Sequence, residues 1–87
     1  MSFIKFSAPW CAPCKELAKR LQLFSSVSVS DVDIKKNPEE ALKFNVRGVP
    51  TLVKLDGNGL EVNRLVGLPT VEKLKEFLTE GNTSENN

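Results

Sequence analysis

The pattern of apolar and polar residues in the first part of the chain predicts a strand, a helix and a second strand. The run from Phe3 to Phe6 predicts a short buried strand. Residues 27–34 predict another strand, in which serines alternate with valines as is typical of an edge strand with one solvated face. Between them, residues 14–24 predict a helix, because apolar residues recur at helical spacing: Leu17, Ala18, Leu21 and Phe24.

The next part of the chain predicts a short helix and a hairpin. A helix is expected to begin at Asn37 and end near Asn45, since Asn37 is a good cap, Pro38 suits the first turn and Glu40 is placed for a capping box. Residues 51–55 and 61–66 predict two strands. The Asp-Gly pair at residues 56–57 is a strong signal for a hairpin between them.

A third helix is predicted near the end of the chain. Thr70 is its expected cap, and Gly81 its expected end. Its inward residues are expected to be Val71, Leu74, Phe77 and Leu78. Residues 82–87 are expected to form a flexible tail, so that the domain covers residues 1–81.

The order of these elements predicts an α/β fold, β-α-β-α-β-β-α. Two strands joined by a helix are expected to run parallel, with a right-handed crossover. The last two strands are expected to form an antiparallel hairpin. The prediction is therefore one domain with a four-stranded mixed sheet and helices on both faces.

Composition and charge exclude several classes of function. The chain has 87 residues with 12 Lys and Arg against 11 Asp and Glu, a net charge of +1, so no basic excess favours nucleic acid. No apolar run approaches the ~18 residues of a membrane helix. The first six residues lack the features of a signal peptide, so we expect a cytoplasmic protein.

Two cysteines and no histidine limit the chemistry further. Zinc needs four ligands, so a metal site within one chain is not expected, although a site shared between two chains stays open. A catalytic triad with histidine is excluded. A structural disulfide between Cys11 and Cys14 would close a very short loop and contribute little stability. No cofactor is expected.

The cysteines stand where a strand gives way to a helix. Unpaired N–H groups and the helix dipole there stabilise a thiolate at Cys11 and lower its pKa. Cys14 lies almost one turn later, within reach of Cys11, so the pair can cycle between dithiol and disulfide. Pro13 restricts the backbone between them and is tolerated in a first helical turn.

Three motifs in order resemble those of the thioredoxin family, over residues 3–80. They are Trp10-Cys11-Ala12-Pro13-Cys14-Lys15, Arg47-Gly48-Val49-Pro50-Thr51 and Val66-Gly67. The resemblance implies a thioredoxin-like fold, with Cys11 as nucleophile and Cys14 as resolving thiol. It also implies a cis Pro50 facing the cysteines and a substrate-docking surface formed by Trp10, Ala12, Pro13, Val49, Pro50 and Gly67.

Two of these motifs also have a plainer interpretation. Val49-Pro50 alone is more often an ordinary turn before a strand, because cis X-Pro bonds are uncommon. Trp10 alone could be a core aromatic, but its place beside a polar turn favours a contact surface.

The chain departs from the family at Lys5, where the family usually has a buried acid six residues before the first cysteine. A lysine in a central strand is unfavourable unless it is paired. We hypothesise a reversed ion pair between Lys5 and Asp31 beneath Cys14, which would favour the Cys14 thiolate and make the protein more oxidising. The alternative is that Lys5 extends to solvent, on a face left uncovered because the chain starts without the usual first strand and helix.

The leading functional hypothesis is a monomeric thiol–disulfide oxidoreductase that reduces protein disulfides. A flavoenzyme resembling thioredoxin reductase, or glutathione, would supply its electrons. One alternative is a glutathione-coupled reductase resembling the glutaredoxins, although only Gly67 stands where paired glycines are usual. Another is a binding subunit of a larger complex, in which redox chemistry is secondary. No nucleic acid or membrane is expected as a partner.

Overall fold

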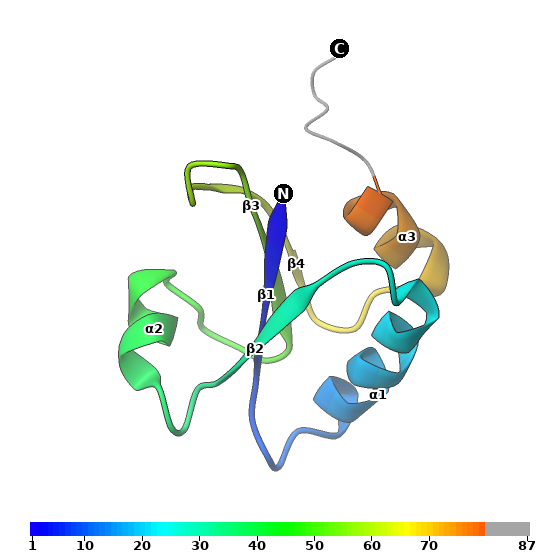
Figure 1. Ribbon diagram of the computed structural model, residues 1–87. Coiled ribbons are helices and arrows are strands. Elements are labelled where there is room, and N and C mark those ends of the chain that lie inside the picture. Colours follow the sequence, from blue (N-terminus) through cyan, green and yellow to red (C-terminus); the bar gives the residue numbers. More distant parts are fainter. Residues whose placement is uncertain (80–87) are drawn as a thin grey trace.

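The computed structural model describes residues 1–79, and its elements follow the predicted order (Figure 1). The predicted helix end at Gly81 and the tail at residues 82–87 lie outside that range. The strands are β1 (Ser2–Ser7), β2 (Val29–Asp33), β3 (Thr51–Leu55) and β4 (Glu61–Val66). The helices are α1 (Ala12–Leu21), α2 (Pro38–Lys43) and α3 (Val71–Thr79), and a 3₁₀ turn, η1 (Gln22–Phe24), continues α1.

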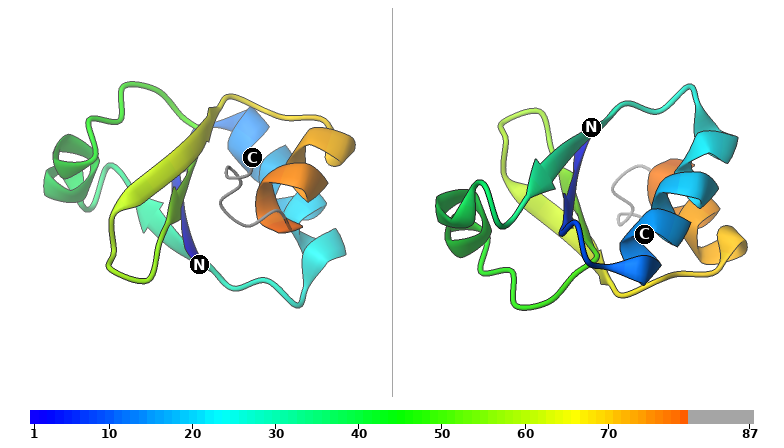
Figure 2. Two further views of the ribbon diagram at one scale, coloured as in Figure 1. Left: turned by 90° about the horizontal axis from the view of Figure 1, so that it is seen from above. Right: turned by 90° about the horizontal axis from the view of Figure 1, so that it is seen from below.

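The four strands form one mixed sheet in the order β2-β1-β3-β4. β1 runs parallel to β2 and antiparallel to β3, and β3 and β4 form the antiparallel hairpin. Figure 2 shows α1 and α3 on one face of the sheet and α2 on the other. The predicted fold class and the edge position of the serine-bearing strand are therefore confirmed.

Alternation along β1 supplies both faces with core residues, because successive side chains point to opposite sides. Phe3 faces α3, where its ring lies 5.8 Å from that of Phe77. Phe6 is fully buried on the other face, 5.7 Å from the ring of Phe44 at the end of α2. The larger core lies on the first face and contains Phe3, Leu17, Leu52, Leu74, Phe77 and Leu78.

The start of α1 and the capping of α2 differ from the prediction. Helix α1 begins at Ala12 rather than near Cys14, because Cys11 is extended and accepts a hydrogen bond from the Cys14 N–H, which makes it the N-cap. The predicted side-chain cap at Asn37 is wrong, since no side-chain hydrogen bond caps α2. The Asn37 carbonyl instead accepts the N–H of Glu40, so the first turn closes through the backbone.

Within residues 70–79, the predictions for α3 are confirmed except at one residue. The Thr70 hydroxyl oxygen accepts the N–H of Lys73 at 3.1 Å, as expected of a cap. Leu74, Phe77 and Leu78 are buried, but Val71 is 39% exposed. Val71 is the first residue of the helix, and its predicted inward position is therefore wrong.

The strand register brings four connecting segments to one end of the sheet. Ser7, the last residue of β1, pairs with Asp33, the last residue of β2. Thr51 begins β3, where it pairs with Phe6 on one side and with Val66, the last residue of β4, on the other. The segments that follow β1, β2 and β4 and the one that precedes β3 therefore start from the same edge. None of the helices within residues 1–79 is long and apolar enough to cross a bilayer.

Candidate active site

The segment after β1 places the two cysteines at the start of α1. The Cys11 N–H donates to the Ala8 carbonyl at 3.2 Å, which turns the chain from the strand into the helix. Cys11 is extended, with φ −93° and ψ 105°, while Pro13 lies in the first helical turn, where the N–H it lacks would have no intrahelical partner. Local backbone chemistry thus sets the spacing between Cys11 and Cys14.

Cys11 and Cys14 are joined by a disulfide bond, with their Cα atoms 5.2 Å apart. The Cys14 N–H donates to the Cys11 sulfur at 3.2 Å. This N–H is one of the first of α1, which have no partner inside the helix and carry the positive end of its dipole. The same donor stabilises negative charge on the Cys11 sulfur once the disulfide is opened.

The disulfide is largely buried at the end of the sheet. Cys11 and Cys14 are 7% and 4% exposed and form a small cluster with Ala8, against which Ile34 and Val49 pack. The cluster thus joins the segments after β1 and β2 to the segment before β3.

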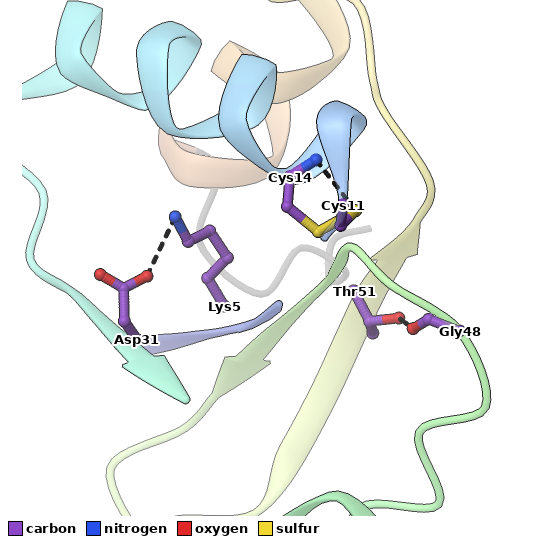
Figure 3. The surroundings of a disulfide bond; sticks show 6 residues. All are labelled: Lys5, Cys11, Cys14, Asp31, Gly48 and Thr51. Atoms are coloured by element: carbon purple, nitrogen blue, oxygen red, sulfur yellow. Dashed lines mark hydrogen bonds and ion pairs between the residues drawn. A yellow bond between two sulfur atoms is a disulfide. The ribbon is translucent and has the colours of Figure 1, made fainter. Parts of the chain in front are cut away.

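The segment before β3 is fixed by three local features. The Val49–Pro50 peptide bond is cis, and Pro50 is fully buried. The Thr51 hydroxyl donates to the Gly48 carbonyl at 2.8 Å (Figure 3). The Gly67 N–H donates to the Pro50 carbonyl at 2.8 Å, and Gly67 has φ +88°, a conformation that favours glycine. The second and third sequence motifs are therefore hydrogen-bonded to each other.

Several residues around the cysteines are exposed. Trp10 is 67% exposed, so it is not a core aromatic. Ala12 and Pro13 are also exposed. Val66 and Leu68, on either side of Gly67, are 70% and 39% exposed, and the sequence reasoning gave neither a contact role. A valine at the end of a strand looks like a core residue in sequence, and only its exposure distinguishes it.

Lys5 and Asp31 form an ion pair across the β1–β2 register. Lys5 Nζ lies 3.0 Å from Asp31 Oδ1, and the two residues are direct partners in the parallel ladder. Figure 3 shows the Lys5 side chain extending beneath α1 toward Asp31, with the disulfide farther along the same helix. The Lys5 side chain is 10% exposed and that of Asp31 is 68% exposed. The pair thus exists with a buried cation and a solvated anion, and Lys5 itself does not extend into solvent.

An open pocket of about 260 Å³ is lined by both Lys5 and Cys14. Its lining includes Lys5, Cys14, Lys15, Ala18 and Asp33. A second pocket, of about 390 Å³, lies along β2 and α1 and is lined by Lys5 and Asp31 but by neither cysteine. Water can therefore reach the ion pair from one side and the space beside Cys14 from the other. Residues 1–79 contain no group of three or more His, Cys, Asp and Glu side chains placed to hold a metal.

Comparison with known proteins is consistent with this site. The family model for thioredoxin matches residues 1–80. The chain is 40% identical over 80 residues to the SPbeta prophage-derived thioredoxin-like protein YosR of Bacillus subtilis (strain 168), covering 92% of this chain and 98% of that protein. It is also 40% identical over 80 residues to a thioredoxin domain-containing protein of Theileria parva, but this match covers 86% of this chain and only 36% of that protein.

A solved thioredoxin structure has the same fold as this chain. A mutant thioredoxin from Halobacterium salinarum NRC-1 superposes with a TM-score of 0.80 at 32% identity. The match covers 88% of this chain and 70% of that chain.

Proposed function

Because the chain belongs to the thioredoxin family, we propose that it reduces protein disulfides by dithiol–disulfide exchange, with Cys11 as the nucleophile and Cys14 as the resolving thiol. The paired cysteines of this family make it a thiol–disulfide oxidoreductase. The observation that supports the roles is the 3.2 Å hydrogen bond from the Cys14 N–H to the Cys11 sulfur at the start of α1. It favours the thiolate at Cys11 over the one at Cys14.

The proposed reaction begins with the reduced pair. The Cys11 thiolate attacks one sulfur of the substrate disulfide, forms a mixed disulfide and releases the other substrate sulfur as a thiolate, which takes up a proton. Cys14 loses its proton and attacks the Cys11 sulfur, so the mixed disulfide breaks and the second substrate thiolate leaves. The substrate gains two electrons, and the protein is left with the Cys11–Cys14 disulfide.

The substrate would dock beside the exposed face of the disulfide. Trp10, Val66 and Leu68 supply exposed apolar area. Val49 packs against the cysteine cluster, and within residues 1–79 its backbone N–H and carbonyl have no hydrogen-bond partner. That backbone is free to pair with an extended substrate segment. The other proposed contacts are Ala12, Pro13, Pro50 and Gly67, of which Pro50 is buried and would act through the shape of its loop.

Lys5 and Asp31 are proposed to tune the pair rather than to touch substrate. Lys5 lines the same pocket as Cys14, and we propose that the positive charge of its side chain favours the Cys14 thiolate in the reduced protein. A stabilised reduced form makes the protein a stronger oxidant. Asp31 holds the ammonium in place and offsets part of its charge.

Turnover needs two electrons from a donor. We propose a flavoenzyme similar to thioredoxin reductase, with glutathione as the second candidate. The single Gly67 at the end of β4, in place of paired glycines, favours the flavoenzyme. The monomeric state and the cytoplasmic location expected from the sequence stay predictions.

Insulin reduction with dithiothreitol tests the proposal. The protein is expected to accelerate precipitation of the insulin B chain, and Cys11→Ser is expected to abolish the acceleration. Cys14→Ser should still attack once, so it should accumulate a mixed disulfide with insulin but not turn over. Circular dichroism would verify that both variants are folded. Activity that survives Cys11→Ser would contradict the proposal and favour a binding role.

The donor is tested by replacing dithiothreitol. NADPH with a thioredoxin reductase is expected to sustain insulin reduction. NADPH with glutathione and glutathione reductase is expected to sustain it poorly, and little reduction of hydroxyethyl disulfide is expected. The opposite ranking would make glutathione the donor.

A further inference from the structure

The four segments that meet at the disulfide end of the sheet carry a local excess of positive charge. They are residues 7–15, 33–37, 46–50 and 66–70, which follow β1, follow β2, precede β3 and follow β4. They contain four cations, Lys15, Lys35, Lys36 and Arg47, and one anion, Asp33, for a net charge of +3. The whole chain has a net charge of only +1, so all other residues together are negative.

The four cations, hereafter the cationic rim, each stand within two residues of the cysteine cluster or of a residue that packs against it. Lys15 follows Cys14 directly and lines the pocket beside it. Lys35 and Lys36 follow Ile34, which packs against the cluster, and Arg47 lies two residues before Val49, which does the same. All four side chains are exposed. Among residues 1–79, none of the four forms an ion pair.

Asp33, the one anion in these segments, offsets only one of the four positive charges. An Asp33 carboxylate oxygen accepts the backbone N–H of Lys35 at 2.9 Å, which turns the chain out of β2. The Lys35 and Lys36 side chains continue into solvent beyond that turn. The four segments therefore keep a net charge of +3 at an end of the molecule whose centre is apolar, with Trp10 67% exposed.

We propose that the cationic rim selects disulfide substrates whose cystine is flanked by acidic residues. An apolar centre with a charged periphery is the usual arrangement of a protein-binding surface, in which rim charges steer encounter and choose partners. The proposal rests on the proposed function and adds to it a substrate class, namely acidic polypeptide segments. A polypeptide is favoured over other polyanions because the exposed Trp10 and the free Val49 backbone suit an extended chain.

Two synthetic peptides test this selection. They have the same length and one intramolecular disulfide, and differ only in flanking residues, two glutamates or two lysines. The reduced protein is mixed with each peptide, quenched with acid and separated by chromatography, which gives the second-order rate constant of reduction. At about 20 mM salt the acidic peptide is expected to react roughly tenfold faster. At about 500 mM salt the ratio should fall below about twofold, because screening shortens the range of the charges.

Charge reversal assigns the effect to the cationic rim. Lys35→Glu with Lys36→Glu is expected to remove or invert the preference without abolishing reduction, because neither residue contacts a sulfur. Lys73→Glu with Lys75→Glu is the matched control, since it changes the net charge by the same amount in the same direction, and both residues are exposed on α3, outside the four segments. It should leave most of the preference.

The outcomes separate the two proposals. If both peptides are reduced at equal rates in low salt, or the preference survives the double reversal, the selection is refuted while the proposed function stands. If neither peptide is reduced although the protein is folded, the proposed function fails, and the selection with it.

Discussion

The Lys5–Asp31 pair predicts that two charge-removing substitutions have unequal effects on stability. The separation of 3.0 Å corresponds to about 1.4 kcal/mol at the dielectric constant of water and about 5.5 kcal/mol at an effective value of 20. Asp31 is 68% exposed and Lys5 only 10%, and a pocket admits water beside them, so the attraction falls between these limits. The desolvation cost falls almost entirely on Lys5.

Asp31→Asn should therefore be the more damaging change. It leaves a buried ammonium without its anion, and we expect a loss of about 2–3 kcal/mol in the free energy of unfolding. Lys5→Met keeps the length and apolar stem of the side chain and leaves a solvated aspartate behind, so its cost should stay below about 0.5 kcal/mol or become a gain. Urea unfolding of the oxidised protein measures both, with Lys19→Met on exposed α1 as the matched control.

The same variants test the proposed effect on Cys14. The difference between the unfolding free energies of the oxidised and reduced forms reports the redox equilibrium of the pair, and 30 mV corresponds to about 1.4 kcal/mol. A charge acting across the pocket, partly offset by Asp31, contributes on the order of 1 kcal/mol, or roughly 20 mV. Lys5→Met should make the potential more negative by that amount at pH 9 and by less at pH 7, because the charge acts on the thiolate.

Two results would refute this reasoning. If Lys5→Met destabilises the protein as much as Asp31→Asn does, the unequal burial of the two charges does not control the pair. If the redox potential of Lys5→Met is unchanged at both pH values, Lys5 does not act on Cys14 and the pair is structural only.

Three further predictions concern stability. A hydrogen bond from Arg64 holds the pKa of Glu61 below its usual 4.5, so the pair stabilises the fold above about pH 4.5 and this stability is lost as the pH falls through the lowered pKa. Urea midpoints between pH 3 and 7 should show that Glu61→Gln loses less stability in acid than the unchanged protein does. An equal loss would contradict the assignment. Gly59 has φ +79°, and a methyl group added there would meet only open space, so Gly59→Ala should cost about 1 kcal/mol from backbone strain alone. Gly57→Ala in the same turn should be neutral or slightly stabilising. Equal effects of the two substitutions in thermal melts would disprove this. Leu17 is fully buried against the sheet, so Leu17→Ala should cost about 2–5 kcal/mol in urea unfolding, and a loss under 1 kcal/mol would show that the core rearranges to fill the space.

Features determined by a few neighbouring residues could be predicted from the sequence. The Asp-Gly turn, the bounds of β3 and β4 and the Thr70 cap depend on local chemistry, and the structure agrees with them. Asn37 is the N-cap of α2 as predicted, but its side chain makes no capping hydrogen bond, because the Asn37 N–H donates to the Asp33 carbonyl and the Asn37 carbonyl accepts the N–H of Glu40. Local propensity gives way wherever another local bond satisfies the same groups.

The candidate site likewise has features that local sequence determines and features that it does not. The spacing of Cys11 and Cys14 at a strand-to-helix junction already indicates the exchange chemistry, since the sulfurs and the helix N–H groups are set by residues within one turn. The exposure of Val66 and the pocket shared by Lys5 and Cys14 have no comparable local signal, because each depends on segments brought together by the strand register.

The order of the elements, the reactive pair and the family resemblance all follow from the amino-acid sequence, because they depend on periodicity and on contacts between near neighbours. The burial of Lys5 beside a solvated Asp31, and the meeting of three cation-bearing segments at one end of the sheet, arise only in the folded chain. Burial and charge clustering both depend on residues that are far apart in the sequence, and the packing of the sheet and helices decides which of these residues lie close together.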